Sequence, residues 1–416
     1  MAAFQGSLAG VTGVIHKKMH GEFPSTDHSW RQVRAGCFNG SIDIYAIYDE
    51  LRQQAPAWQA PWGDVYITKY DLVSSCLVNR QLSHVPPGEA DADTQRSAVN
   101  DWLMYQEGRA HAAIRQALQQ PFVGNGMAAV APVVAEAIDQ LVTKADLSGT
   151  VDVVAAFTRA VPERVIGRLL GVPAEDMPML RAWSAAIRTM LDTGFDEAFS
   201  SMPNATDAMS AYFTELLRGQ LVAGEMPPLL VGLPALADAV GLTVAGRNIA
   251  FLAFAGHETT VHLLGNMLFH LAHAPAQWAA LRADPHLVAN AVAETLRLES
   301  PVQKICRWPL QPTALDGQPV DKEQMLVLLV GAANRDPAQF PQSQRFDVSR
   351  PGKQNLAFGR GAHVCIGKAL AEMEGKRLLE AVLHRWKSIE PVPGGARWMD
   401  NSSIRGLDSL ALRLVA

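Results

Sequence analysis

The residues best suited to chemistry lie in the ten-residue segment 358–367, FGRGAHVCIG. Gly359 and Gly361 permit backbone conformations that other residues avoid, so the chain can turn tightly there and approach a flat ligand closely. Cys365 follows at the expected start of a helix, where free N–H groups and the helix dipole favour a thiolate. Because the thiolate is the form of cysteine that binds metals, the segment predicts a metal-binding sulfur.

Two further residues of this segment fit a large planar cofactor. Gly367 removes a side chain where a helix would collide with a macrocycle, and His363 offers a donor for an acidic group at its edge. A lone buried cysteine is more often structural and inert, and Cys365 by itself would be interpreted that way. The full pattern Phe-Gly-x-Gly-x-His-x-Cys-x-Gly, however, resembles the haem-binding signature of the cytochrome P450 family at all six fixed positions.

A second candidate site is the run from Ala255 to Thr259, AGHET, inside a long apolar segment. The small residues Ala255 and Gly256 leave a helix surface hollow, and the Thr259 hydroxyl can bond back to the carbonyl of Ala255 and open the helix. Such a gap can hold dioxygen and water. Glu258 would supply protons to it, because heterolytic O–O cleavage consumes two protons.

From the residues alone, Glu258 could equally be a buried acid in a salt bridge, and Thr259 a packed side chain. The spacing resembles the oxygen-activation motif of the same family, in which a small residue, glycine, any residue, an acid and threonine follow one another. The resemblance implies that Glu258 belongs to a proton relay and that Thr259 assists oxygen activation. His257 takes the variable position, where substrate contact and simple packing both remain open.

Glu294 and Arg297 lie three residues apart, as in an ordinary ion pair on a helix surface. Their segment, ETLR, also resembles the Glu-x-x-Arg pair of the family, and Arg350 in FDVSR matches its third member. The resemblance implies a structural network of these three residues rather than a catalytic one.

Haem carries two propionates, which need cationic or hydrogen-bonding partners where they are buried. Besides His363, the family's usual partners match His111 and Arg115, which share a helix face, and Arg307. Solvated charges are the alternative for each. Relatives commonly carry Asp-Pro-Pro-x-His where this chain has residues 107–111, EGRAH, so the entrance to this helix departs from the pattern. The predicted cofactor-binding residues are therefore His111, Arg115, Ala255, Gly256, Arg307, Phe358, Gly359, His363, Cys365 and Gly367, with Cys365 as the metal ligand.

Hydrophobic periodicity predicts the elements that position these residues. We expect a small sheet within 65–85 and a helical body over 102–170 and 177–221. Residues 223–240, with three prolines, are expected to form a mobile loop. An interior helix is expected from Thr243 to about His273, another from Asp284-Pro285 to Leu298, short strands in KICRWPL and MLVLLVG, and a last helix from near Cys365 to about Trp386.

The family resemblance covers about residues 60–412. It implies a mainly α fold with a small β-rich lobe, the cytochrome P450 fold, in one haem-thiolate domain spanning 1–416, whose first 30 residues or so can be flexible. The cofactor would be haem b, and one atom of O2 would enter the substrate.

Composition excludes several other classes. A net charge of −5 and a pI near 6.2 give no overall attraction to nucleic acid. Four cysteines without CxxC pairing fit a reducing, cytoplasmic setting. The N-terminus is too short and too broken by glycine for a signal peptide or an anchor. His257 and Glu258 argue against a membrane span in the long apolar segment.

The chain lacks flavin, nicotinamide and Fe–S signatures, so the resemblance implies electrons from a ferredoxin and its NAD(P)H-dependent reductase, docked on Arg360, Lys368, Lys376 and Arg377. The expected reaction is hydroxylation or epoxidation of a hydrophobic small molecule, as in secondary metabolism. Oxidative coupling, desaturation, peroxide-driven oxidation and a non-catalytic haem-thiolate sensor remain alternatives. The family's substrate-contact regions correspond here to Trp102, Leu103, Phe251, Phe254, His257, Val302 and Ile404, with Arg96 or His257 available for a polar group.

Overall fold

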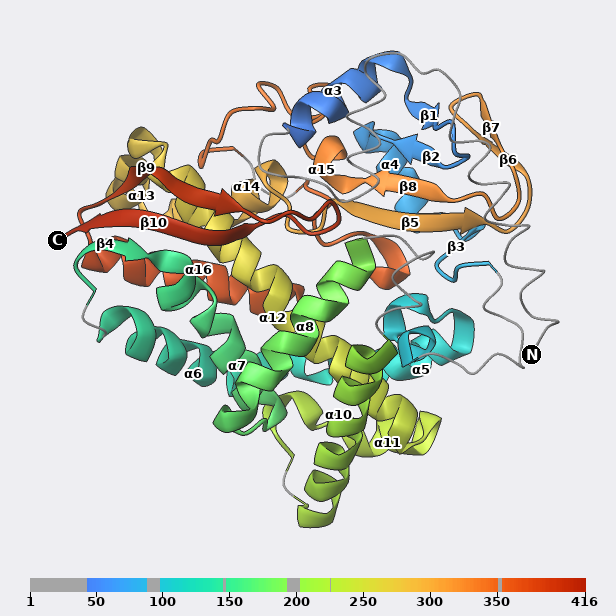
Figure 1. The fold of residues 1–416 in the computed structure, drawn as a ribbon, viewed down its shortest axis with the longest axis horizontal. Coiled ribbons are helices and arrows are strands. Elements are labelled where there is room, and N and C mark those ends of the chain that lie inside the picture. Colours follow the sequence, from blue (N-terminus) through green and yellow to red (C-terminus); the bar gives the residue numbers. More distant parts are fainter. Residues whose placement is uncertain (1–42, 88–97, 145–146, 193–202, 225, 351–353) are drawn as a thin grey trace, which may run out of the picture.

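The computed structural model describes residues 43–87, 98–144, 147–192, 203–224, 226–350 and 354–416. Arg96 and the N-terminal segment that was expected to be flexible lie outside these ranges. The molecule has a roughly triangular outline, with helices filling one side and sheets the other (Figure 1). This arrangement is the mainly α fold with a small β-rich lobe that the sequence predicts.

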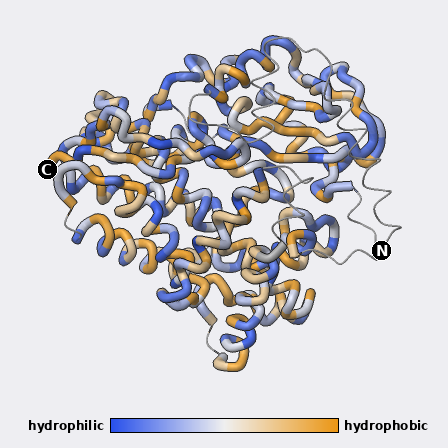
Figure 2. Tube along the Cα trace, viewed as in Figure 1, coloured by the Kyte–Doolittle hydropathy of each residue, from blue (hydrophilic) through white to orange (hydrophobic). Residues whose placement is uncertain are grey.

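The helical part is built around one long central helix, α12. Apolar residues, orange in Figure 2, are frequent along its helices, and many of their side chains belong to one continuous core. Its principal helices are α5 (Gly108–Gln119), α6 (Gly126–Ile138), α7 (Ala160–Leu170), α8 (Met177–Asp192), α10 (Pro203–Ala223), α11 (Leu233–Val240), α12 (Leu242–Ala272), α13 (Pro275–Ala283), α14 (Val288–Leu298) and α16 (Lys368–Arg385).

The β-rich lobe is a five-stranded sheet with the order β1-β2-β8-β5-β3. Its strands are β1 (Ala57–Gln59), β2 (Val65–Ile67), β8 (Leu326–Leu329), β5 (Lys304–Pro309) and β3 (Leu82–Ser83), with α3 (Ile44–Gln54), α4 (Tyr70–Val78) and α15 (Val330–Ala333) nearby. Only β2 and β8 pair in parallel. A second sheet joins β4 (Gly149–Asp152), β10 (Leu407–Val415) and β9 (Ser388–Trp398), and β6 (Thr313–Leu315) pairs with β7 (Gln318–Val320).

The central helix α12 explains the apolar run in the sequence. It packs against α7, α10, α14 and α16, so nearly all its faces meet other helices. A helix that is apolar all round must be buried on all sides, and most of α12 is. Its interior course is therefore confirmed. The helix begins after Gly241, two residues earlier than a Thr243 cap would place it.

The prediction of a loop at 223–240 is wrong. Pro228–Leu230 form a turn of 3-10 helix, and Leu233–Val240 form α11. Pro234 lies in the first turn of α11, where its missing N–H would be unpaired in any case, so the proline starts the helix rather than breaking it. Leu233 and Leu236 are fully buried, which fixes the segment against the core.

Glu294 and Arg297 form a buried ion pair, not a surface one. Their side chains are 1% and 2% exposed, and Arg297 donates to both carboxylate oxygens at 2.7 and 2.8 Å. Arg350 adds a contact to Glu294 at 3.3 Å. Arg297 also donates to the carbonyls of Asn334 and Ser343. The network thus ties α14 to the long irregular segment that precedes Cys365, as the sequence predicts.

A second buried carboxylate, Glu299, joins distant parts of the chain. It accepts a hydrogen bond from the Tyr45 hydroxyl at 2.7 Å, lies 3.0 Å from the ring of His270, and pairs with Arg335 and Arg405. The Tyr45 ring lies under the guanidinium of Arg335, 3.3 Å from its centroid. Burial would raise the pKa of Glu299, but Arg405, His270 and Arg335 outweigh it and lower the pKa.

Within the described residues, Gly126–Thr143 is long and apolar enough to cross a membrane by length and composition alone. The bent pair 205–223 and 228–240 meets the same criterion only as a pair. Both stretches pack within this fold, the first against α7 and α16.

Candidate active site around Cys365

The loop before Cys365 folds as its glycines require. Gly359 and Gly361 have φ of +67° and +76°, in the left-handed region that favours glycine. The backbone N–H of Cys365 donates to the carbonyl of Phe358 at 2.9 Å and closes the loop. The helix α16 begins at Lys368, so Cys365 lies just before it rather than in its first turn.

This position changes the expected state of the sulfur. The Cys365 side chain is exposed, yet the protein atoms around it raise the pKa of its thiol, against the lowering effects of the Gly367 N–H, Arg115 and Lys368. The N–H groups of the helix start thus favour a thiolate as expected, but without a metal they do not outweigh this desolvation. Metal coordination deprotonates a cysteine outright, so a bound metal would convert the Cys365 thiol into the thiolate that these neighbours favour.

Gly367 fits a flat group next to the sulfur. Its φ is −86°, which any residue adopts, and a Cβ placed there would meet no protein atom within 4 Å among the described residues. Neither backbone strain nor protein packing therefore accounts for glycine at this position. A macrocycle lying against Cys365 would account for it, because its edge needs the space of a side chain.

Three imidazoles and two guanidinium groups gather beside this loop. The ring of His363 stacks on His84, with centroids 3.6 Å apart, and on His111, with centroids 4.1 Å apart. Burial, followed by the neighbouring positive groups, lowers the pKa of His363 to about 3. Arg307, 5% exposed, has its pKa lowered to about 10 by burial, and burial also lowers the pKa of Arg115.

Several donors of this cluster lack a protein partner. Within the described part of the chain, Nε2 of His84, Nε2 of His111 and Nε of Arg307 are buried without a hydrogen bond. Orphaned buried donors are costly, and mutual repulsion among positive groups adds to the cost. Two carboxylates at the edge of a haem ligated by Cys365 supply the acceptors and negative charge that this cluster needs, so these residues fit haem.

On α12, which packs against α16, the threonine hydroxyls bond as expected. Thr259 donates to the carbonyl of Ala255 at 2.9 Å, and Thr260 donates to that of Gly256 at 3.1 Å. The helix is not broken by this hydrogen bond, because α12 runs without interruption from Leu242 to Ala272. A Cβ on Gly256 would lie 3.0 Å from Ile166, so this glycine permits close packing with α7 rather than leaving a hollow.

Glu258 lies in a buried network with one arginine and two histidines. Its carboxylate accepts a hydrogen bond from Arg188 on α8 and lies 3.3 Å from Nε2 of His262 and 3.7 Å from Nε2 of His257. Burial alone would raise the pKa of Glu258, but His262, Arg188 and His257 together lower it. The salt bridge that the residues left open is therefore present. Nδ1 of His257 also contacts the carbonyl of Ala253 at 2.7 Å.

Two of the expected substrate-contact residues meet on one face of α12. The indole of Trp102 stacks on the ring of Phe251, with centroids 5.0 Å apart, and is 1% exposed. The N–H of the next residue, Leu103, donates to Oδ1 of Asn248 at 2.8 Å. Segment 98–105 is thereby held against the helix that carries Glu258 and Thr259.

The other expected contacts come from the β-rich side and from the core. Val302 and Ile404 pair in an isolated antiparallel bridge, which joins the segment before β5 to the turn between β9 and β10. Phe254 on α12 is 3% exposed. The structure thus brings Trp102 together with Phe251, and Val302 together with Ile404.

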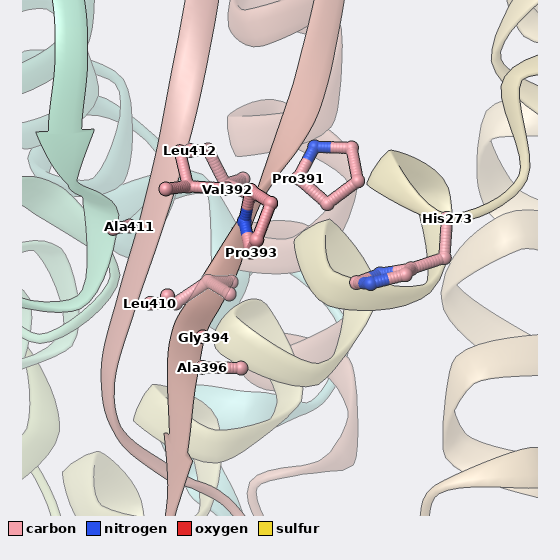
Figure 3. Close-up of a pocket in the computed structure, with 10 residues that line it drawn as sticks. His273, Pro391, Val392, Pro393, Gly394, Ala396, Leu410, Ala411 and Leu412 are labelled. Atoms are coloured by element: carbon pink, nitrogen blue, oxygen red, sulfur yellow. The ribbon is translucent and has the colours of Figure 1, made fainter.

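A separate surface pocket lies away from these residues. It is lined by His273 at the end of α12 and by Pro391, Val392 and Leu410 of the β9–β10 hairpin, among others (Figure 3). None of its lining residues belongs to the predicted site.

The sequence analysis missed three residues of this site. His84, Arg188 and His262 lie in no motif, and they reach the site only through the pairing of β3 with β5, the packing of α8 on α12, and the i,i+4 spacing from Glu258. Of these signals, only the helical spacing of His262 from Glu258 could have been read from the sequence.

Comparison with known proteins agrees with this site. The cytochrome P450 family model matches residues 246–403. The chain is 33% identical to "Cytochrome P450 monooxygenase PikC" of Streptomyces venezuelae, over 90% of this chain and 91% of that protein.

Two solved structures show the same fold. "P450BioI in complex with hexadec-9Z-enoic acid ligated Acyl Carrier Protein" is 27% identical, with a TM-score of 0.83 over 89% of this chain and 98% of that one. "The cytochrome P450 enzyme CxnD for C-S bond formation in chuangxinmycin biosynthesis" is 25% identical, with a TM-score of 0.79 over 90% and 94%.

The cysteine loop, the cluster of unpaired donors beside it and the similarity over nine-tenths of the chain lead to the same conclusion. This chain belongs to the cytochrome P450 family and is a haem-dependent monooxygenase.

Proposed function

We propose that this monooxygenase hydroxylates or epoxidises a hydrophobic small molecule, as in secondary metabolism. The observation that carries the proposal is a group of aromatic side chains on and against α12, the helix that holds the oxygen-activation motif. Trp102 and Phe251 stack there, and Phe254 lies on the same helix. Aromatic and aliphatic walls recognise apolar substrates by excluding water. The expectation of an apolar substrate follows from these residues.

The chain's own residues would hold the cofactor at three points. The Cys365 sulfur would ligate the iron, and His111, Arg115, Arg307 and His363 would bind the carboxylates. When bound, a thiolate-ligated haem supplies the two-electron activation of O2 that monooxygenation requires. Charge-assisted hydrogen bonds from the cluster to the carboxylates would fix the orientation of the macrocycle.

Glu258 and Thr259 would manage protons on the distal side. Thr259 carries a hydroxyl that already donates to the Ala255 carbonyl, so its oxygen can accept a further hydrogen bond. Glu258 is held ionised by Arg188, His262 and His257. For Glu258 to pass protons inward, its carboxylate must leave Arg188, and movement of α8 would control that step.

Electrons would come from a ferredoxin and its NAD(P)H-dependent reductase in the cytoplasm. The expected basic docking surface is weaker than its sequence indicates, because Lys368, Lys376 and Arg377 lie 3.8 Å from carboxylates on their own helix. Arg360 donates to Ser74. If this surface binds the donor, the rate of the first electron transfer falls as ionic strength rises. A rate unchanged between low and high salt would exclude it.

Oxidative coupling is the second candidate function. It is favoured by the similarity to CxnD, an enzyme named for C–S bond formation. Both functions use the same cofactor and the same apolar site. Product analysis separates them, since hydroxylation adds one oxygen atom from O2 and coupling removes two hydrogen atoms from the substrate.

A spectral titration tests the proposal. Purified holoenzyme would be titrated with apolar, polar and charged compounds, and displacement of the sixth iron ligand followed by absorbance. We expect apolar compounds to bind most tightly, whereas displacement by small charged compounds alone would refute the substrate class. The carbon monoxide complex of the reduced protein, in the same preparation, should show the red-shifted Soret band of thiolate ligation.

A further inference from the structure

His84 lies outside every motif, yet the fold places it beside the cofactor-binding cluster. The short strand β3 pairs antiparallel with β5, so that Leu82 faces Pro309 and Ser83 faces Trp308. Continuing this register by one residue brings His84 next to Arg307. The two strands therefore deliver a histidine and an arginine to the same place.

The ring of His84 is in direct contact with the histidine of the cysteine loop. It stacks on His363 with 3.6 Å between centroids and 19° between planes, and His111 stacks on His363 in turn. Burial, then Arg307 and His111, lowers the pKa of His84 to about 3. Arg307 and His111 thus lie near His84, and an anion placed beside them would interact favourably with all three.

One side of the His84 ring is already committed. Oε1 of Glu107 accepts the backbone N–H of His84 at 2.7 Å and the Ser83 hydroxyl at 3.0 Å, and it lies 3.5 Å from Nδ1 of His84. Glu107 at Nδ1 fixes the orientation of the imidazole, and a haem carboxylate at Nε2 would draw a second proton onto the ring, because both ring nitrogens donate only in the imidazolium form. The other nitrogen, Nε2, is buried and has no hydrogen-bond partner within the described residues.

We propose that His84 is an additional ligand of a haem carboxylate, donating from Nε2, and that Glu107 is the positioning residue that orients it. With His84, the haem carboxylates would have five partners instead of the four that the sequence predicts, which are His111, Arg115, Arg307 and His363. The proposal also gives Glu107 a role, although this helix entrance departs from the family's Asp-Pro-Pro-x-His pattern. The five groups would bind the carboxylates from four segments, because His111 and Arg115 share α5, so the cofactor would lock β3, β5, α5 and the cysteine loop together.

Haem dissociation measures this contact without reference to turnover. Ferric holoenzyme would be mixed with excess apomyoglobin, and haem transfer followed by absorbance. His84→Phe keeps a ring to stack on His363 but removes the donor, so haem should leave about 10-fold faster, as expected for one charge-assisted hydrogen bond. His84→Gln retains an N–H donor and should stay closer to wild type. His384→Phe, at an exposed histidine of α16, should leave the rate unchanged.

Haem dimethyl ester separates a carboxylate contact from a packing effect. Wild-type and His84→Phe apoproteins would each be loaded with haem or its dimethyl ester, forming a double-mutant cycle between residue and cofactor. The difference between the two proteins should disappear with the ester. An equal acceleration with both cofactors, or none with haem, would overturn the proposal.

Glu107→Gln provides a milder variant in case His84→Phe fails to load haem. It weakens the orientation of the ring and leaves His84 in place, so the dissociation rate should rise less than in His84→Phe. A Glu107→Gln protein with the wild-type dissociation rate would contradict the positioning role.

Discussion

Arg188 on α8 donates a hydrogen bond to the carboxylate of Glu258 on α12, and so connects two helices through the acid of the oxygen-activation motif. The two residues are 70 positions apart in the chain. Both side chains are largely buried, at 24% and 9% exposed, so solvent weakens their attraction only in part. The proton-delivery role proposed for Glu258 is therefore coupled to the position of α8.

Replacing Arg188 with Gln should move the pH dependence of turnover. Without the guanidinium, burial is opposed only by the two histidines, so the pKa of Glu258 rises from its lowered value. Because the Glu258 carboxylate must be ionised to accept each proton that it then passes inward, the acid limb of the kcat profile should shift to higher pH. The profile would be measured with a saturating electron donor. A limb at the wild-type position would show that Glu258 does not limit turnover through its ionisation.

Glu258→Gln removes the ionisable group and keeps the size and shape of the side chain. We expect kcat to fall about 100-fold, the usual scale of a lost general acid or base, while the spectral dissociation constant for substrate stays close to wild type. Comparing turnover in H2O and D2O should show a larger solvent isotope effect in the variant. Wild-type kcat in this variant would exclude Glu258 from proton delivery.

Thr259→Ala should keep haem and lose coupling. The Thr259 hydroxyl is the group placed to order protons and water near the Ala255 carbonyl, so its removal should divert reducing equivalents to hydrogen peroxide. The ratio of peroxide and product to NADH consumed measures this loss. Thr260→Ala removes the neighbouring hydroxyl, which bonds to Gly256, and serves as the matched control. Equal coupling in both variants would remove Thr259 from the assigned role.

Glu299→Gln should weaken the protein most at neutral pH. The pKa of Glu299 is lowered in the folded state, so its charge stabilises the fold fully above its unfolded pKa of about 4.3, and this stabilisation is lost progressively as pH falls from there through the lowered folded pKa. Removing the charge leaves Arg405 and Arg335 without their buried counter-ion, which should lower the unfolding free energy by roughly 3 kcal/mol at pH 7. Urea unfolding of both proteins at pH 7 and at pH 3, well below the unfolded pKa, should show a smaller difference at pH 3. Glu390→Gln, which breaks an exposed pair with Arg413, is the control and should cost less than about 1 kcal/mol.

Arg297→Lys tests the buried network below the cysteine loop. Lysine keeps the charge but cannot bridge both oxygens of Glu294 while also donating to the Asn334 and Ser343 carbonyls. We expect a loss of about 3 kcal/mol in unfolding free energy, read from the urea midpoint of the apoprotein. Arg218→Lys, in an exposed pair with Glu215, should change the midpoint little. An Arg297→Lys midpoint equal to wild type would show that charge alone maintains the network.

The sequence predicted what depends on local spacing. The glycines around Cys365, the back-bonding of Thr259 and the apolar run of α12 are properties of short segments, and each has the expected local form. Contacts between distant segments were missed, because the β3–β5 register that brings His84 to Arg307 leaves no periodic signal. Residues 223–240 were misjudged for a related reason, since proline ends or begins a helix according to its position in the turn.

Tyr45 makes the start of the described fold a part of its interior. The Tyr45 hydroxyl donates to Glu299, and the guanidinium groups of Arg335 and Arg405 lie over the Tyr45 ring. The helix α3 therefore covers two arginines and a carboxylate from the far end of the chain. Cleavage by a protease beyond Ile44 would expose these charges to water. Unfolding that begins at the N-terminal end would therefore extend to the region around β9 and β10. Resistance to digestion at this end should report the integrity of the whole molecule.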